Sequence, residues 1–269
     1  MKIGFLITVR LKSTRLKQKV LLDLNSFTVI ERVIQRAKEV IDKSNIVLCT
    51  STIKQDLPLI DYAKNNEINF FCGDPDDVLQ RLLDAAKDNS LTHFIGITAD
   101  NPLFSIEHAI KIRKLFGKTP SLDFVFTQGM PIGANIYGIN CKALETVCNV
   151  KEQIDTEIWG PLINRPDIFN VETINAEAEY IRKNYRLTLD EEDDYILFKA
   201  IYDNYPEQEV IDLLSAYDFL DNNPQLSTVN EKVVQKELDP EIVRKIDDYY
   251  LSEREQILAI KERVYNSRQ

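Results

Sequence analysis

Histidine is nearly absent from this sequence: His93 and His108 are the only two among 269 residues. A His-rich metal site or a catalytic triad built on histidine therefore has little to draw on. Cysteine is also scarce, and its four copies form neither a CxxC pair nor a dense disulfide framework. We expect reduced thiols in or near the core of a cytoplasmic protein. The four are Cys49, Cys72, Cys141 and Cys148.

Long apolar runs are missing as well. The clearest one, residues 4–9, is far shorter than the roughly 20 residues that a membrane-spanning helix needs. It begins just after Lys2 and no cleavage site follows it, so we expect neither a membrane span nor a signal peptide.

Basic residues are outnumbered: 33 Lys and Arg stand against 43 Asp and Glu, for a formal charge of −10. This balance argues against general binding to DNA, RNA or anionic membranes, which needs a dominant basic surface. It still permits a local basic pocket for a small anion. The length allows one α/β domain, alone or with a modest appendage.

Short apolar runs alternate with helical patterns over the first 120 residues. Such alternation is typical of βαβ units and a parallel sheet. The predicted strands are residues 3–9, 46–50, 68–72 and 92–98, and the predicted helices are 29–41, 57–63, 78–86 and 106–117.

After residue 120 the alternation of strands and helices becomes less regular. An amphipathic pattern predicts a long C-terminal helix over residues 242–264. We therefore expect an α/β fold, with a mostly parallel sheet between helices on both faces and a helical C-terminal extension. The further strands are expected at 122–127, 133–139 and 186–189, and the further helices at 142–150, 156–164 and 190–202.

Ligands bind beyond the carboxyl ends of the strands in parallel sheets. The segment after the first strand, residues 10–19, suits a polyphosphate, because Arg forms bidentate bonds to phosphate while hydroxyls and backbone N–H groups complete a cradle. It is neither a Walker loop nor a dinucleotide fingerprint. The alternative is a solvated basic turn. The cations and hydroxyls of the 10–19 segment are Arg10, Lys12, Ser13, Thr14, Arg15, Lys17 and Lys19.

Two carboxylates stand where strands are predicted to end. Asp100 follows the strand at 92–98, and Asp190 follows the strand at 186–189. Mg²⁺ binds one or two carboxylates together with phosphate oxygens. The alternatives are an Asx-type turn at Asp100 and a helix N-cap at Asp190, where further acids favour the helix dipole.

Three segments together match a known pattern: Arg10, Ser13, Thr14, Arg15, Leu16, Lys19, Val20 and Leu21; then Asp100, Pro102 and Leu103; then Leu187, Thr188, Asp190 and Asp193. With them, residues 1–205 resemble the cytidylyltransferases that activate acidic sugars. These are the CMP-Kdo and CMP-sialic acid synthetase group, and most closely the spore-coat-polysaccharide-F-like branch. Residues 73–81, which end at Arg81, also resemble that branch. The loop departs from the family's usual Pro-Gly at Lys17-Gln18.

The resemblance implies a Rossmann-like, three-layer nucleotidyltransferase fold over residues 1–205, with residues 206–269 as the helical extension. It also implies transfer of CMP from CTP to an acceptor with release of pyrophosphate, in surface polysaccharide or glycan precursor synthesis. The acceptor is an acidic sugar, nonulosonic or Kdo-like, or a small phosphorylated compound. We expect a homodimer that requires Mg²⁺.

Residue roles follow from the same resemblance. Arg10, Lys19 and Asp100 are the expected catalytic residues, and Asp100 and Asp190 are the expected Mg²⁺ ligands. Acceptor contacts are assigned to Gln128, Asn135 and Arg186, with ordinary surface groups as the alternative. The expected nucleotide contacts are Val9, Arg10, Ser13, Thr14, Arg15, Lys19, Thr50, Ser51, Arg81 and Thr98.

Two other functions compete. A glycosyltransferase that uses a nucleotide-sugar has a related sheet, but it usually carries Asp-x-Asp after the fourth strand. Here the segment is Ala99-Asp100-Asn101, with no second acid at that spacing. A non-catalytic nucleotide-binding scaffold is the other alternative, against which the joint presence of Arg10, Lys19, Asp100 and Asp190 counts.

Overall fold

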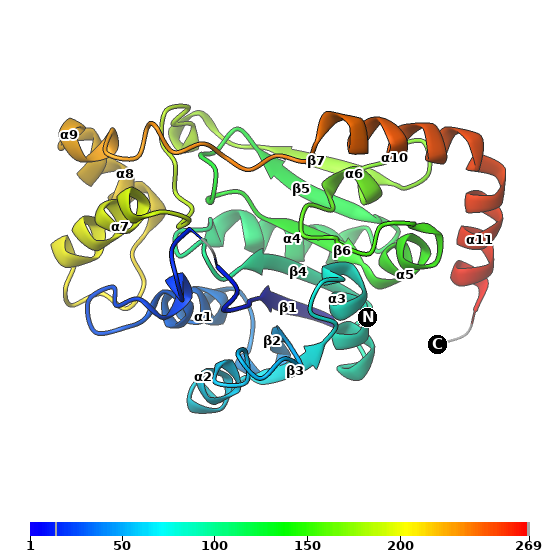
Figure 1. Cartoon of the computed structure of the whole chain (residues 1–269), viewed down its shortest axis with the longest axis horizontal. Helices are drawn as coiled ribbons and strands as arrows, with labels where there is room; N and C mark the ends of the chain where they lie inside the picture. The colour runs from blue at the N-terminus through cyan, green and yellow to red at the C-terminus, as the bar shows by residue number, and fades with distance from the viewer. Residues whose placement is uncertain (14, 268–269) are drawn as a thin grey trace.

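A seven-stranded sheet organises the chain in the computed structural model, which describes residues 1–13 and 15–267 (Figure 1). The strands are β1 Ile3–Thr8, β2 Ile46–Ser51, β3 Asn69–Gly73, β4 His93–Thr98, β5 Phe124–Gln128, β6 Tyr137–Asn140 and β7 Val171–Asn175. Their order across the sheet is β3-β2-β1-β4-β6-β5-β7. Only β6 runs against its two neighbours, so the expected mostly parallel sheet is confirmed.

Helices cover both faces of this sheet, as predicted. They are α1 Val29–Val40, α2 Leu59–Asn65, α3 Val78–Asp88, α4 Ile106–Lys118, α5 Cys141–Val150, α6 Gly160–Ile163, α7 Glu192–Asn204, α8 Leu213–Asp221, α9 Pro224–Ser227, α10 Pro240–Ser252 and α11 Arg254–Asn266. None that the structure describes is both long and apolar enough to cross a bilayer. Short 3₁₀ turns lie at Lys19–Leu21, Lys43–Asn45 and Ala178–Tyr180.

Strand β1 shows why two helical layers are needed. Phe5 and Ile7 pack into the core under α1, α2 and α4, whereas Leu6 packs into the opposite core under α3 and α5. Successive side chains of a strand point to opposite faces, so a strand that is apolar throughout must be covered twice.

The polypeptide after residue 205 is divided between the two ends of the molecule (Figure 1). Helix α8 joins a third core with α7, and α10 and α11 pack against the α3–α5 layer. The connector between α9 and α10, residues 228–239, crosses from one end to the other, and we call it the C-terminal strap. The boundary at residue 205 between a catalytic domain and an extension stays a prediction.

Several elements differ from expectation. The predicted strand at 186–189 is extended backbone with a single bridge, Ile132 to Arg186. The helix predicted at 156–164 shrinks to α6, because Asp77 binds Thr156 and holds the preceding segment as a loop. The long C-terminal helix breaks at Glu253, where α11 turns to pack on α5. Strand β7 and helix α8 were not predicted.

One glycine lets the 187–189 segment approach the sheet. Gly133 has a positive φ of 91°, and a Cβ at this position would overlap the backbone carbonyl of Leu187. The Leu187 amide donates to the Ile132 carbonyl at 2.7 Å, and the Leu189 amide donates to the Asp100 carbonyl at 2.8 Å. This close approach carries the chain directly to residue 190 beside the end of β4.

We predict that Gly133→Ala lowers the free energy of unfolding by about 2 kcal/mol or more, because it adds both an unfavourable φ and a backbone overlap. The matched control is Gly117→Ala in α4, where a Cβ meets nothing within 4 Å. That change is expected to be neutral or stabilising by up to about 1 kcal/mol. Urea unfolding of both variants is the measurement, and equal stability of the two would contradict the packing argument.

Candidate functional site

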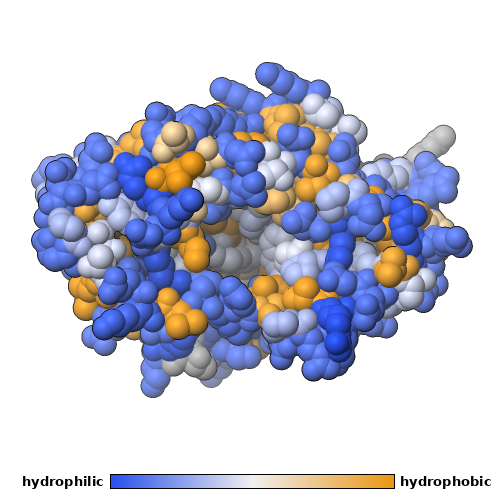
Figure 2. Space-filling view, turned by 90° about the horizontal axis from the view of Figure 1, so that it is seen from above, coloured by the Kyte–Doolittle hydropathy of each residue, from blue (hydrophilic) through white to orange (hydrophobic). Residues whose placement is uncertain are grey.

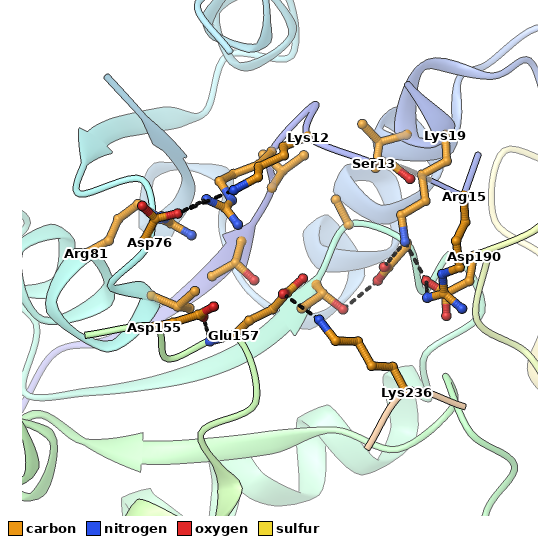
Figure 3. Close-up of a pocket in the computed structure, with 18 of the residues that line it drawn as sticks. Lys12, Ser13, Arg15, Lys19, Asp76, Arg81, Asp155, Glu157, Asp190 and Lys236 are labelled. Carbon is orange, nitrogen blue, oxygen red and sulfur yellow. Dashed lines mark hydrogen bonds and ion pairs between the residues drawn. The ribbon is translucent and has the colours of Figure 1, made fainter. Parts of the chain in front are cut away.

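A pocket of about 410 Å³ opens beyond the carboxyl ends of β1 and β4 (Figure 3). Figure 2 shows that the face seen from above is hollowed near its middle. Six cations and five carboxylates line the pocket: Arg10, Lys12, Arg15, Lys19, Arg81, Lys236, Asp76, Asp100, Asp155, Glu157 and Asp190. Strand ends bring most of these charges together, as the parallel sheet predicts.

The ammonium of Lys19 lies between two carboxylates. It is 2.5 Å from Oδ2 of Asp100 and 2.8 Å from Oδ1 of Asp190. Asp100 also accepts from the hydroxyl of Thr98 at 2.6 Å. Burial by itself would lower the pKa of Lys19, but the attraction of both carboxylates outweighs it and raises that pKa. Lys19 is therefore held as a cation.

Three cationic side chains contact the carboxylate of Asp190. Besides Lys19, Arg15 approaches its Oδ1 at 2.9 Å, and Arg186 donates to its Oδ2 at 2.7 Å. Burial would raise the pKa of Asp190, but these three cations outweigh burial and lower that pKa. The carboxylate is thus kept ionised in a partly buried place.

Arg186 lies beneath Asp190 rather than in the pocket lining. Its Nε donates to the fully buried Asp194 at 3.0 Å, and its Nη1 donates to Gln235 at 2.5 Å. Asp194 also accepts from the amides of Asp190 and Glu191, at 2.9 and 3.0 Å, and so caps α7. Arg186 and Asp194 together fix the position of Asp190.

Two arginines lie at the other end of the pocket. Arg10 pairs with Asp76 at 3.2 Å and donates to the Pro75 carbonyl. Arg81 is buried and donates to the Asp74 carbonyl, and its Nε has no partner among the described residues. Burial lowers the pKa of Arg81. The Nε donor at this end of the pocket is thus both buried and, within the part of the chain that the structure describes, unpaired.

Thr50 and Ser51 are fully buried and do not line the pocket. The Ser51 hydroxyl donates to Asp56, and Asp56 accepts from the amide of Leu11 at 2.7 Å. Ser51 therefore supports the start of the basic loop from behind. The Thr50 hydroxyl has no partner among the described residues.

Of the remaining expected nucleotide contacts, Val9, Ser13 and Thr98 line the pocket. Thr14 lies outside the described residues.

Two expected acceptor contacts, Gln128 and Asn135, lie outside this pocket's lining. Gln128 is exposed at the end of β5 and donates to Asn175 at 2.7 Å. Asn135 donates to the carbonyls of Met130 and Pro131, at 3.0 and 3.2 Å, so its amide group closes a turn.

Four charged pocket residues were not predicted as site residues: Asp76, Asp155, Glu157 and Lys236. Asp76 lies in the 73–81 segment that resembles the family, whereas the other three come from irregular segments that no local pattern marks. The ring of Trp159 packs edge-on against Tyr137 and Phe124, and it also lines the pocket.

This arrangement suits a polyphosphate and a divalent cation. Arg and Lys side chains complement phosphate oxygens, and Asp100 and Asp190 present hard oxygen ligands on either side of one ammonium. No cluster of three or more His, Cys, Asp or Glu able to hold a metal occurs in residues 1–13 and 15–267. A cation here would need phosphate oxygens to complete its shell, which is the usual habit of Mg²⁺.

Comparison with known proteins identifies relatives of this chain. The family model for cytidylyltransferases matches residues 5–155, which include the basic loop and Asp100. The spore coat polysaccharide biosynthesis protein SpsF of Bacillus subtilis is 25% identical over 235 residues, which is 84% of this chain and 97% of that protein.

Two solved structures share the fold. A cytidylyltransferase from Leptospira borgpetersenii serovar Hardjo-bovis superposes with a TM-score of 0.78 and 24% identity, over 89% of this chain and all of the other. A CMP:2-keto-3-deoxy-manno-octonic acid synthetase complexed with CTP gives a TM-score of 0.61 and 14% identity, over 76% of this chain and all of the other.

We predict a pH signature for Asp190. Because its pKa is lowered from 3.8, its ionised form stabilises the fold; that contribution is present above pH 3.8 and is lost as pH falls through the folded-state value. The stability gap between the wild-type protein and Asp190→Asn should therefore be constant near neutrality and shrink below pH 3.8.

Urea unfolding between pH 2 and 7 measures this gap. Asp218→Asn on α8 is the control, since Asp218 is exposed and makes no ion pair within the described residues. A gap for Asp190→Asn that does not change with pH would contradict the assignment.

Proposed function

This chain belongs to the cytidylyltransferase family, and on that premise we propose that its pocket transfers CMP from CTP to an acidic sugar or a small phosphorylated acceptor, with release of pyrophosphate. Membership makes the chain a nucleotidyltransferase rather than a glycosyltransferase or a scaffold. The observation that carries the proposal is the Lys19 ammonium held between Asp100 and Asp190, in a pocket of many charges at the strand ends. CTP as donor is supported by the synthetase of the same fold that was solved with CTP.

The chemistry is a single displacement. An acceptor oxygen attacks the α-phosphorus of CTP, the new P–O bond forms, and the bond to the pyrophosphate oxygen breaks. Such a reaction needs positioning and neutralised charge more than a covalent catalyst. Arg10 and Lys19, with Arg15 and Ser13 nearby, suit the phosphates, and Arg81 suits the cytidine end of the pocket.

Asp100 and Asp190 are the residues proposed to hold Mg²⁺. When bound, the ion neutralises charge on phosphate oxygens and on the leaving pyrophosphate. Lys19 neutralises the same two carboxylates in the structure, and its ammonium would stand beside any ion that they hold. Arg186 and Asp194 keep Asp190 in place for that role.

The biological setting is part of the proposal. Similarity to a spore coat polysaccharide biosynthesis protein supports a role in surface polysaccharide or glycan precursor synthesis. The acceptor is proposed to be a nonulosonic or Kdo-like sugar acid, giving a CMP-sugar, or a small phosphorylated compound, giving a CDP-linked product. We place the enzyme in the cytoplasm, where CTP is available, and expect a homodimer from the resemblance to acidic-sugar cytidylyltransferases.

Pyrophosphate release with CTP, UTP, ATP and GTP tests the proposal, over a panel of sugar acids and small phosphates with Mg²⁺. Release with CTP and one acceptor is the expected result. Wild-type protein that fails to bind CTP, or that releases pyrophosphate equally with all four nucleotides, would overturn the assignment.

We predict that Lys19→Ala weakens CTP binding at least about tenfold, since the loop loses a partly buried cation that is proposed to contact the phosphates. Lys17→Ala is the matched control, because Lys17 belongs to the same loop but is exposed and does not line the pocket. Isothermal titration of both variants measures the effect. Equal affinities would remove Lys19 from the phosphate site.

We also predict that Asp100→Asn and Asp190→Asn each lower Mg²⁺-dependent turnover at least about 10²-fold, as expected when a charge-neutralising metal is lost. Circular dichroism establishes that the variants are folded, and the rate is measured across a Mg²⁺ titration. Folded variants with the wild-type rate and the wild-type Mg²⁺ requirement would show that the metal binds elsewhere.

A further inference from the structure

The C-terminal strap contributes a side chain to the pocket. Lys236 lines it and pairs with Glu157 at 3.2 Å. Figure 3 shows Glu157 between the Arg81–Asp76 group on one side and the Lys19–Asp190 group on the other, with Lys236 reaching toward it. Both residues lie outside the segment that matches the cytidylyltransferase family model.

The strap is fixed at this place by the residues that support Asp190. Asn230 is buried and donates to the Arg186 carbonyl at 3.0 Å and to Asp194 at 2.8 Å. Gln235, next to Lys236, accepts from Arg186. The position of Lys236 is therefore tied to Asp190 through Arg186 and Asp194.

The Lys236–Glu157 pair is open to exchange. The side chains are 63% and 55% exposed, and exposed ion pairs contribute little to stability. The other pocket cations are engaged differently: Lys19 and Arg15 contact Asp190, and Arg10 contacts Asp76. Lys12 is as exposed as Lys236, but it pairs with Asp76 at 3.7 Å, in the group that holds Arg10. Lys236 is therefore the exposed, weakly held cation of the pocket that lies away from Asp76 and can exchange its partner for an incoming anion.

We propose that Lys236 and Glu157 form the acceptor site of the enzyme, an inference that rests on the proposed function. Lys236 leaves Glu157 and binds the acceptor's anionic group, a carboxylate or a phosphate. Glu157 then accepts a hydrogen bond from an acceptor hydroxyl. The site follows from the position of the pair between the cytidine end and Asp190, where an acceptor must approach the α-phosphate.

Steady-state kinetics test the assignment on the full chain. Lys236→Ala should raise the acceptor KM at least tenfold, leave the CTP KM within twofold, and be partly rescued by Lys236→Arg. Lys232→Ala is the matched control, since Lys232 is an exposed lysine of the same strap that does not line the pocket; it should match the wild-type protein. Sugar acids and sugar phosphates are compared as acceptors, and the arm that loses affinity identifies the anionic group.

A binding measurement keeps this inference separate from the proposed function. N-acetylneuraminate, 3-deoxy-D-manno-octulosonate and glycerol 3-phosphate are titrated into the protein with a non-hydrolysable CTP analogue. At least one should bind the wild-type protein and bind Lys236→Ala tenfold more weakly.

An unchanged acceptor KM in an active Lys236→Ala enzyme would overturn the inference and leave the proposed function intact. A raised CTP KM would instead assign Lys236 to the nucleotide, and this also overturns it. Absence of turnover in the wild-type protein counts against the proposed function, whereas the titration still decides the role of Lys236. Failure of all three probes to bind the wild-type protein would refute the acceptor site.

Discussion

The rest of the site depends on one interaction: a single ammonium, that of Lys19, shared by Asp100 and Asp190. It joins the basic loop, the end of β4 and the start of α7. Two partly buried carboxylates at close range repel one another unless a cation lies between them. Asp190 reaches Asp100 because Gly133 leaves room for the 187–189 segment and because the Leu189 amide donates to the Asp100 carbonyl.

The same constraint explains how the pocket stays folded while it is highly charged. Six cations and five carboxylates nearly cancel, and within the described residues all of them except Arg81 and Asp155 form ion pairs with one another. A buried charge without a partner is costly, so the pairs are needed until ligands arrive. In the proposed function, a triphosphate would pair with the cations and a divalent ion with the carboxylates, so ligand binding would replace these ion pairs with other pairs of opposite charge.

The sequence allowed the sheet, the basic loop and Asp100 to be predicted, because strand ends follow from local apolar patterns. Other assignments depended on contacts that no local pattern encodes. Thr50 and Ser51 end a strand, yet both are buried behind the residues that line the pocket, where the Ser51 hydroxyl donates to Asp56. Arg186 was expected at a strand, but the 186–189 segment is held by Gly133 and turns that side chain under Asp190. Glu157 and Lys236 stand in irregular segments, and only the fold brings them together.

The residues that line the pocket come from two parts of the chain. Residues 5–155, which match the family model, supply the basic loop, Arg81 and Asp100, whereas Asp190, Glu157 and Lys236 come from the later part. Arg186 connects that later part, since it bonds Asp190 and also Gln235 beside Lys236. Substitutions in the strap can therefore alter the side of the pocket at Lys236 without disturbing the sheet. They can do so only within the limits set by the arginine that also fixes Asp190, so in the proposed function acceptor recognition would be linked to the position of that carboxylate.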